Sequence, residues 1–115
     1  MADFYSGMEV TVPLFPSQLR CGTHPVEKIT AALREHYFGS PVVKVLGSDE
    51  VAALNGFAAA NALSGLDGME LMVLGNDDRL QLIARFDNLG KGSSGAALQC
   101  LNLMLGAQET LGLNL

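Results

Sequence analysis

The chain has 115 residues, of which 49% are hydrophobic and 17% charged, enough to bury one hydrophobic core and therefore to form one domain. Its formal net charge is −5 with lysines and arginines scattered rather than clustered, which argues against nucleic acid or an anionic membrane surface as a partner. No apolar stretch approaches the roughly 20 residues of a membrane span, and Asp3 and Glu9 stand where a signal peptide would carry positive charge, so we expect a cytoplasmic protein.

The first predicted elements are a strand and a helix. Met8, Val10, Val12 and Leu14 alternate with more polar residues, which is the period of a half-buried strand, and Pro13 predicts a position at a sheet edge or a strand end. Apolar residues then recur at helical spacing from Val26 to Tyr37. We expect Thr23 to cap the start of this helix and Gly39 to end it.

The middle of the chain is harder to interpret. The β-branched run at 42–46 predicts a short strand. Residues 49–68 predict a long irregular connection with a short helix around Ala52-Ala53-Leu54, because Asn55-Gly56 and Ser64-Gly65 interrupt any longer repeat.

The last third predicts a hairpin followed by a helix. The apolar runs 69–74 and 80–86 are joined by turn residues, which favours two antiparallel strands. The final helix is expected from about Lys91 to Leu105, where Gly106 stops it. This order predicts an α+β fold with a mixed, largely antiparallel sheet and helices packed on one face.

The stretch between that hairpin and the final helix carries most of the functional information. Gly90, Gly92 and Gly95 have the literal spacing G-x-G-x-x-G, in which bare N–H groups at a helix start can hold a phosphate. A dinucleotide fold needs a further parallel strand after the helix, and the sequence given ends at Leu115. Spacing alone therefore does not predict a self-contained nucleotide site. Asp87 is predicted to cap the N–H groups that follow it.

The cysteines and histidines do not form a recognisable catalytic or metal site. Cys21 and Cys100 make no CxxC pair, so neither a disulfide nor a zinc site is expected. Arg20 could lower the pKa of Cys21, although an unreactive loop cysteine is the simpler interpretation. Cys100 falls on the apolar repeat of the final helix and is predicted to be buried. His24 and His36 are expected at the two ends of the first helix as surface or capping residues.

A long resemblance extends this interpretation. The stretch Asp87-Asn88-Leu89-Gly90-Lys91-Gly92-Ser93-Ser94-Gly95-Ala96-Ala97-Leu98-Gln99 resembles the C-terminal signature of N-acetyl-gamma-glutamyl-phosphate reductases. Segments at 4–14, 35–37, 42–45 and 70–76 extend the resemblance over nearly the whole chain, although the family typically has asparagine at the position of Cys100. The resemblance implies the C-terminal catalytic and dimerisation domain of a semialdehyde-dehydrogenase-like or glyceraldehyde-3-phosphate-dehydrogenase-like enzyme. Residues 1–115 would be one partial domain, lacking the dinucleotide-binding domain.

The implied activity is the NADPH-dependent reduction of N-acetylglutamyl phosphate to N-acetylglutamate semialdehyde in arginine biosynthesis. The family's nucleophilic cysteine and histidine motifs match nothing here, so the chain alone is expected to be inactive. Residue by residue, the resemblance implies that Asn88 holds the nicotinamide carboxamide of NADP and that Gly90, Lys91 and Gly92 border the cofactor. No catalytic or metal residue carries over. Lys91 could instead be a helix-start lysine without a partner.

The final helix also predicts an interaction between chains. Gly92, Ala96 and Cys100 line up with Gly95 beside them, so another backbone could approach closely. The stripe could simply dock on the chain's own sheet, but a chain without its dinucleotide-binding domain would expose apolar surface, so we expect a homo-oligomer. The alternative function is a stand-alone acidic α+β interaction module derived from such an enzyme.

Overall fold

A computed structural model describes residues 3–20 and 22–115. Four strands form a single sheet: β1 (Met8–Leu14), β2 (Val43–Val45), β3 (Met69–Gly75) and β4 (Leu80–Phe86). The three α-helices are α1 (Pro25–His36), α2 (Ser48–Ala53) and α3 (Gly95–Met104). A short 3-10 turn follows β1 at Pro16–Gln18, and a π-helical turn at Gly90–Ser94 leads directly into α3.

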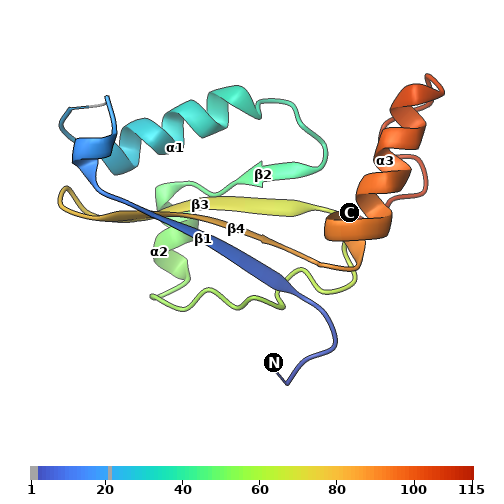
Figure 1. Cartoon of the computed structure of the whole chain (residues 1–115), viewed down its shortest axis with the longest axis horizontal. Coiled ribbons are helices and arrows are strands. Elements are labelled where there is room, and N and C mark those ends of the chain that lie inside the picture. Colours follow the sequence, from blue (N-terminus) through green and yellow to red (C-terminus); the bar gives the residue numbers. More distant parts are fainter. Residues whose placement is uncertain (1–2, 21) are drawn as a thin grey trace.

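The sheet has the order β1-β4-β3-β2 (Figure 1). β4 lies between β1 and β3 and is antiparallel to both, whereas β2 pairs with β3 in parallel. The predicted α+β class, the mixed and mostly antiparallel sheet and the hairpin of β3 and β4 are therefore confirmed. β1 is an edge strand, as Pro13 predicted.

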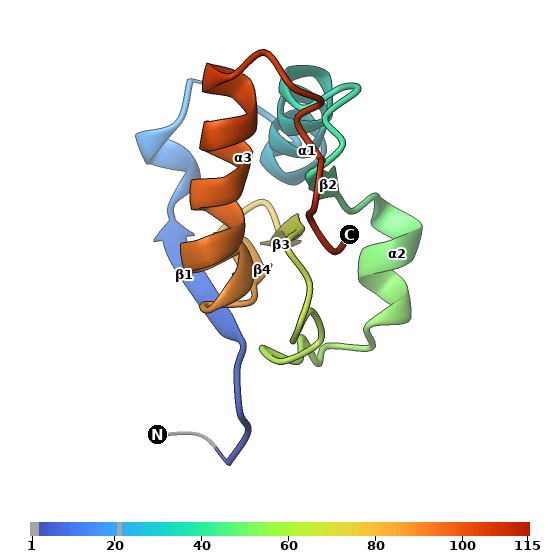
Figure 2. The same cartoon turned by 90° about the vertical axis from the view of Figure 1, so that its right-hand side faces the viewer.

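The prediction that the helices pack on one face of the sheet is wrong. α2 and the segment that follows it pack on the face that carries Met72 and Ile83, where Val51 and Leu54 join the core. α1 lies on the opposite side of the sheet (Figures 1 and 2). The physical reason is that β3 is apolar on both faces, since Met72 and Val73 point in opposite directions and both are buried.

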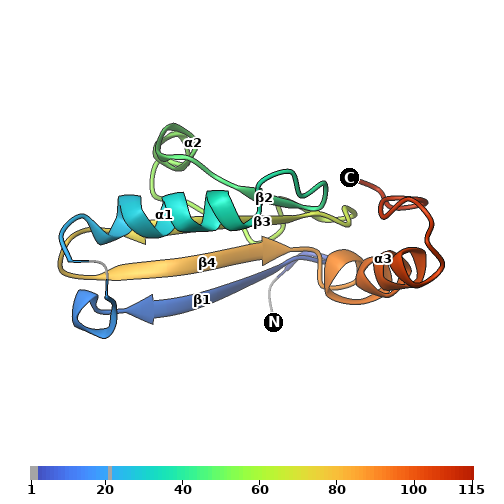
Figure 3. The ribbon, with the colours of Figure 1, turned by 90° about the horizontal axis from the view of Figure 1, so that it is seen from above.

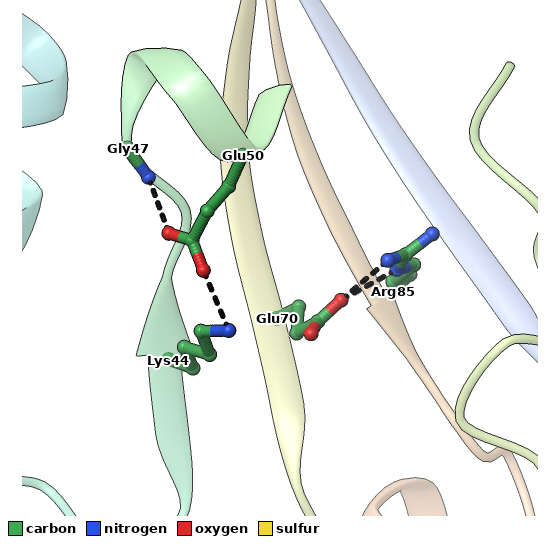
Figure 4. A network of polar contacts seen from close by, with 5 residues as sticks. All are labelled: Lys44, Gly47, Glu50, Glu70 and Arg85. Atoms are coloured by element: carbon green, nitrogen blue, oxygen red, sulfur yellow. Dashed lines mark hydrogen bonds and ion pairs between the residues drawn. The ribbon is translucent and has the colours of Figure 1, made fainter. Parts of the chain in front are cut away.

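Charged residues on neighbouring strands lie side by side on the face of the sheet that carries Met72. Arg85 on β4 lies opposite Glu70 on β3, and its Nη2 and Nε are 2.6 and 2.7 Å from Glu70 Oε2 (Figure 4). Beside them, Lys44 donates to Glu50, which also accepts from Gly47 N at the start of α2. These two donors hold the pKa of Glu50 below its ordinary value.

Two details of the helices differ from the sequence predictions. α1 is preceded by His24 in a left-handed conformation with φ of 56°, and no side chain caps it, so Thr23 is not the N-cap. Pro25 at the first helical position fixes a helical φ there, which favours the start at this residue without a cap. α3 stands across the end of the sheet and extends beyond it (Figure 3). Within the described residues, no helix is long and apolar enough to cross a membrane.

Candidate functional site

The glycine segment, which we define as residues 87–95, runs from the end of β4 into α3. Two other parts of the chain meet it, the residues before β1 and the loop before β3. The strand registers explain this meeting, because Met8 and Met69 both pair with Phe86, so the residues preceding them lie beside the residues following β4.

Asp87 forms hydrogen bonds with all three of these parts of the chain and is 2% exposed. Its Oδ1 accepts from Leu89 N at 2.7 Å and from Gly90 N at 3.2 Å. Its Oδ2 accepts from Ser6 Oγ at 2.7 Å and from Gly65 N. The predicted capping role of Asp87 is therefore confirmed, and the same carboxylate also joins three segments of the chain.

The hydrogen bonds to Asp87 determine its charge. The Gly65 N–H and then the Ser6 hydroxyl are the main causes that lower the pKa of Asp87 from 3.8 to about 2, against the opposing effect of burial. Ser6 Oγ also lies 2.7 Å from Ser64 Oγ. Because the Ser6 proton is given to Asp87, Ser64 is the donor in that second bond. Asp87 is thus a stable anion near neutral pH, which suits a structural carboxylate rather than a catalytic base.

Asn88 follows Asp87 and is half-buried. Its Oδ1 accepts a hydrogen bond of 2.8 Å from Gly7 N. Within residues 3–20 and 22–115, its Nδ2 donates to no group. The acceptor of this amide is therefore used inside the chain, while neither Nδ2 proton has an acceptor among the described residues.

The remaining predicted site residues, Gly90, Lys91 and Gly92, lie in the π-helical turn that leads into α3. A side chain on Gly90 would collide with the Leu66 carbonyl, and one on Gly92 would press on the Phe86 ring at 3.1 Å. Lys91 Nζ donates to Gln99 Oε1 two turns later, so the alternative of a lysine without a partner is wrong. Gln99 in turn donates to Glu109 at 2.6 Å.

Asp67 lies against the glycine segment, and the sequence patterns did not predict a role for it. Its carboxylate occupies the space beside Gly90 and Gly95. The hairpin register contained the signal, since continuing the pairing of Met69 with Phe86 outward places residue 67 beside residue 88.

A cavity of about 370 Å³ opens beside these groups. Its lining residues come from the segment before β1, the loop before β3 and the glycine segment: Tyr5, Ser6, Ser64, Gly65, Asp67, Asp87, Leu89, Gly90 and Ser94. Among the residues that the structure describes, no lysine, arginine or histidine lines it. The cavity therefore offers hydroxyl groups and carboxylates to whatever approaches the start of α3.

The thiol and imidazole groups lie elsewhere. His24 is 4.0 Å from Glu27 on the surface, and His36 stacks edge-on against Tyr37. Cys100 is exposed, so its predicted burial is wrong, because the far half of α3 extends beyond the sheet. Cys21 lies outside the described residues. Among the described side chains, no group of three His, Cys, Asp or Glu residues gathers as a metal site would require.

Comparison with known proteins identifies relatives of this chain. No protein-family model matches it. The N-acetyl-gamma-glutamyl-phosphate reductases of Brucella ovis, Brucella canis and Brucella suis are each 49% identical over 105 residues. The match covers 90% of this chain and 33% of each relative, so the chain spans about a third of the length of the curated relatives it matches. This chain is homologous to part of N-acetyl-gamma-glutamyl-phosphate reductase, as the resemblance in its sequence predicted.

Proposed function

We propose that this chain supplies the cofactor-bordering part of an N-acetyl-gamma-glutamyl-phosphate reductase and corresponds to its C-terminal portion. The observation that carries the proposal is the 49% identity over 90% of the chain, which includes the glycine segment in its densely bonded setting. In the proposed reaction, a hydride from NADPH reduces an acyl phosphate to an aldehyde and phosphate is released.

Asn88 is the residue proposed to contact the nicotinamide. Its Oδ1 is held by Gly7 N, which fixes the orientation of the amide plane. Its Nδ2, which donates to no described residue, can then donate to the carbonyl oxygen of the nicotinamide carboxamide. Positioning the ring in this way contributes to catalysis because hydride transfer depends on the orientation of the ring against the substrate.

The π-helical turn before α3 forms the rest of the proposed cofactor border. The lack of a side chain at Gly90 and Gly92 lets Leu66, Asp67 and the Phe86 ring pack against this turn, which fixes its position. Lys91 has a partner in Gln99 that keeps its ammonium along the helix. We propose that the three residues border the cofactor without supplying a reacting group.

The chain alone is proposed to be inactive in this reaction. The resemblance assigns the nucleophile to a Gly-Cys motif that neither Cys21 nor Cys100 matches. Exposed Cys100 lies on the half of α3 remote from the glycine segment. A thioacyl intermediate would therefore require the remainder of a reductase.

The test is a chimeric Brucella ovis reductase in which this chain replaces the matching residues. We expect NADPH-dependent turnover of N-acetylglutamyl phosphate within about tenfold of the parent, because half of the exchanged residues are already identical. The unmodified Brucella enzyme is the positive control, and this chain by itself is the negative control. A folded chimera without turnover would contradict the proposal.

A second candidate is the stand-alone interaction module. It is favoured by the exposed apolar residues at the end of α3, of which Leu103, Met104 and Leu105 are 57%, 84% and 73% exposed. An active chimera would favour the reductase. A folded but inactive chimera, together with a native polypeptide no larger than 12.1 kDa in its source cells, would favour the module.

A further inference from the structure

Asp67 explains two of the three glycines in the glycine segment. A Cβ on Gly90 would lie 2.5 Å from the Leu66 carbonyl oxygen and 2.9 Å from Asp67 Oδ1, and a Cβ on Gly95 would overlap the Asp67 carboxyl group. Neither glycine has a positive φ. The space that their side chains would need, rather than the backbone conformation, therefore requires glycine at both positions.

The opposite side of Asp67 is held by the end of the chain. Asp67 N donates to Asn114 O at 2.7 Å, and Asn114 N donates to Asp67 Oδ2 at 2.9 Å. The Asn114 side chain also donates to Gly65 O at 2.6 Å. The carboxylate of Asp67 is thus fixed between the C-terminal tail and the start of α3.

Asp67 lies beside the kind of turn against which a glycine-rich loop binds a phosphate. The first turn of a helix has unpaired N–H groups and the positive end of the helix dipole, and both attract an anion. Here Asp87 accepts from two of those N–H groups and Asp67 lies against the same turn. The adjoining cavity is lined by both carboxylates and by no cationic side chain, so a second anion would meet like charges.

We propose that Asp67 is a positioning and specificity residue that fills the start of α3, closes the glycine segment to phosphate groups and holds that segment rigid beside Asn88. The G-x-G-x-x-G spacing then reflects an internal carboxylate rather than a phosphate-binding loop. The part of this inference that concerns the cofactor rests on the proposed function, whereas the exclusion of phosphate does not.

A double-mutant cycle tests the contact without any enzyme assay. Alone, Gly95→Ala should lower the unfolding midpoint of the chain by at least about 5 °C. In an Asp67→Gly background the same change should be neutral or stabilising, because alanine is favoured over glycine inside a helix. Gly92→Ala is the matched control, since Gly92 contacts Phe86 and not Asp67, and its effect should be equal in both backgrounds. An equal effect of Gly95→Ala in the two backgrounds would overturn the proposal.

Titration with inorganic phosphate tests the exclusion on the unmodified chain, which keeps the inference testable if a variant does not fold. The amide resonances of residues 89–95 should show no saturable shift up to millimolar phosphate. A saturable shift confined to these amides would show that the segment is open to phosphate and would overturn the inference.

The chimeric reductase tests the positioning role. Asp67→Asn keeps an acceptor for Asn114 but removes the charge, so we expect the KM for NADPH to rise about tenfold while kcat stays within about twofold. An unchanged KM would count against the positioning role. A wild-type chimera without activity would instead refute the proposed function, and the cycle and the titration would still decide the role of Asp67.

Discussion

The two ends of α3 have opposite surroundings. At its start, Gly95 is buried and the preceding Asp87 accepts four hydrogen bonds from three segments of the chain. The other end of the helix extends beyond the sheet (Figure 3), and there Met104 and Leu105 are 84% and 73% exposed. The start of the helix is therefore fixed by this chain, whereas the end presents apolar surface that the chain does not cover.

This difference separates two roles within one helix. A fixed start is suited to holding a ligand in one orientation, because its side chains cannot rearrange without breaking buried hydrogen bonds. An uncovered apolar end is suited to contact with another polypeptide. We therefore propose that the glycine segment leading into α3 borders the cofactor and that the end of α3 contacts another subunit, and the following experiments test both proposals.

The largest expected effect is on the start of the helix. Asp87→Ala removes the acceptor for Leu89 N, Gly90 N, Gly65 N and Ser6, and should lower the free energy of unfolding by about 3 kcal/mol. Chemical denaturation measures this loss. Asp78→Ala in the exposed turn between β3 and β4 is the control and should cost no more than about 0.5 kcal/mol.

Acidification should loosen the same end of the helix. Because the pKa of Asp87 is lowered from 3.8 to about 2, its contribution to stability is complete above pH 4 and is lost as the pH falls from about 4 to about 2. The contribution is about 2 kcal/mol. Urea denaturation across this pH range should show a shallower acid loss in Asp87→Asn than in the wild type, and parallel curves would contradict the assignment.

A single substitution in α3 should weaken the packing of the C-terminal tail, residues 107–115, against this helix. Asn102 is 4% exposed and donates to Glu109 O at 3.0 Å and to Leu111 O at 2.8 Å. Asn102→Ala should cost about 1 to 2 kcal/mol and increase hydrogen exchange in residues 107–115. Gln108→Ala, at an exposed position of the tail, is the control. Unchanged exchange in the tail would show that these bonds do not hold it.

The smallest effect concerns association through the far end of α3. We expect the chain to form dimers or larger species at micromolar concentration, and the double variant L103E/M104E to weaken that association by about tenfold, near 1.4 kcal/mol. Sedimentation velocity measures this change. Phe38→Glu is the control for added charge, because Phe38 lies two residues after α1 and is 92% exposed. A wild-type chain that is monomeric at these concentrations would refute the proposed homo-oligomer.

Local patterns predicted the elements better than their contacts. β1, α1 and the hairpin of β3 and β4 follow from alternation and helical periodicity, which depend on neighbouring residues. The predicted burial of Cys100 was wrong, because periodicity defines a face of a helix and not what covers that face. The π-helical turn at Gly90–Ser94 was likewise not predicted, since glycine spacing does not distinguish it from an α-helical turn.

The candidate site was predicted in part. Asp87 was recognised as a cap because its N–H donors lie within three residues. The roles of Ser6, Gly65 and Asp67 were missed, because their contacts span long sequence separations and exist only once the strand registers are formed. Continuing the predicted hairpin beyond its last pair would have placed Asp67 beside Asn88, since the pairing of Met69 with Phe86 sets that geometry.

The most direct measurement is the turnover of the chimeric reductase with Asn88→Asp. Aspartate keeps an oxygen acceptor for Gly7 N and removes both Nδ2 donors, so the fold should be preserved while the contact to the cofactor is lost. We expect kcat to fall at least about tenfold, with an unfolding midpoint close to that of the unsubstituted chimera. Unchanged turnover in a folded variant would contradict the claim that Asn88 of the glycine segment holds the nicotinamide.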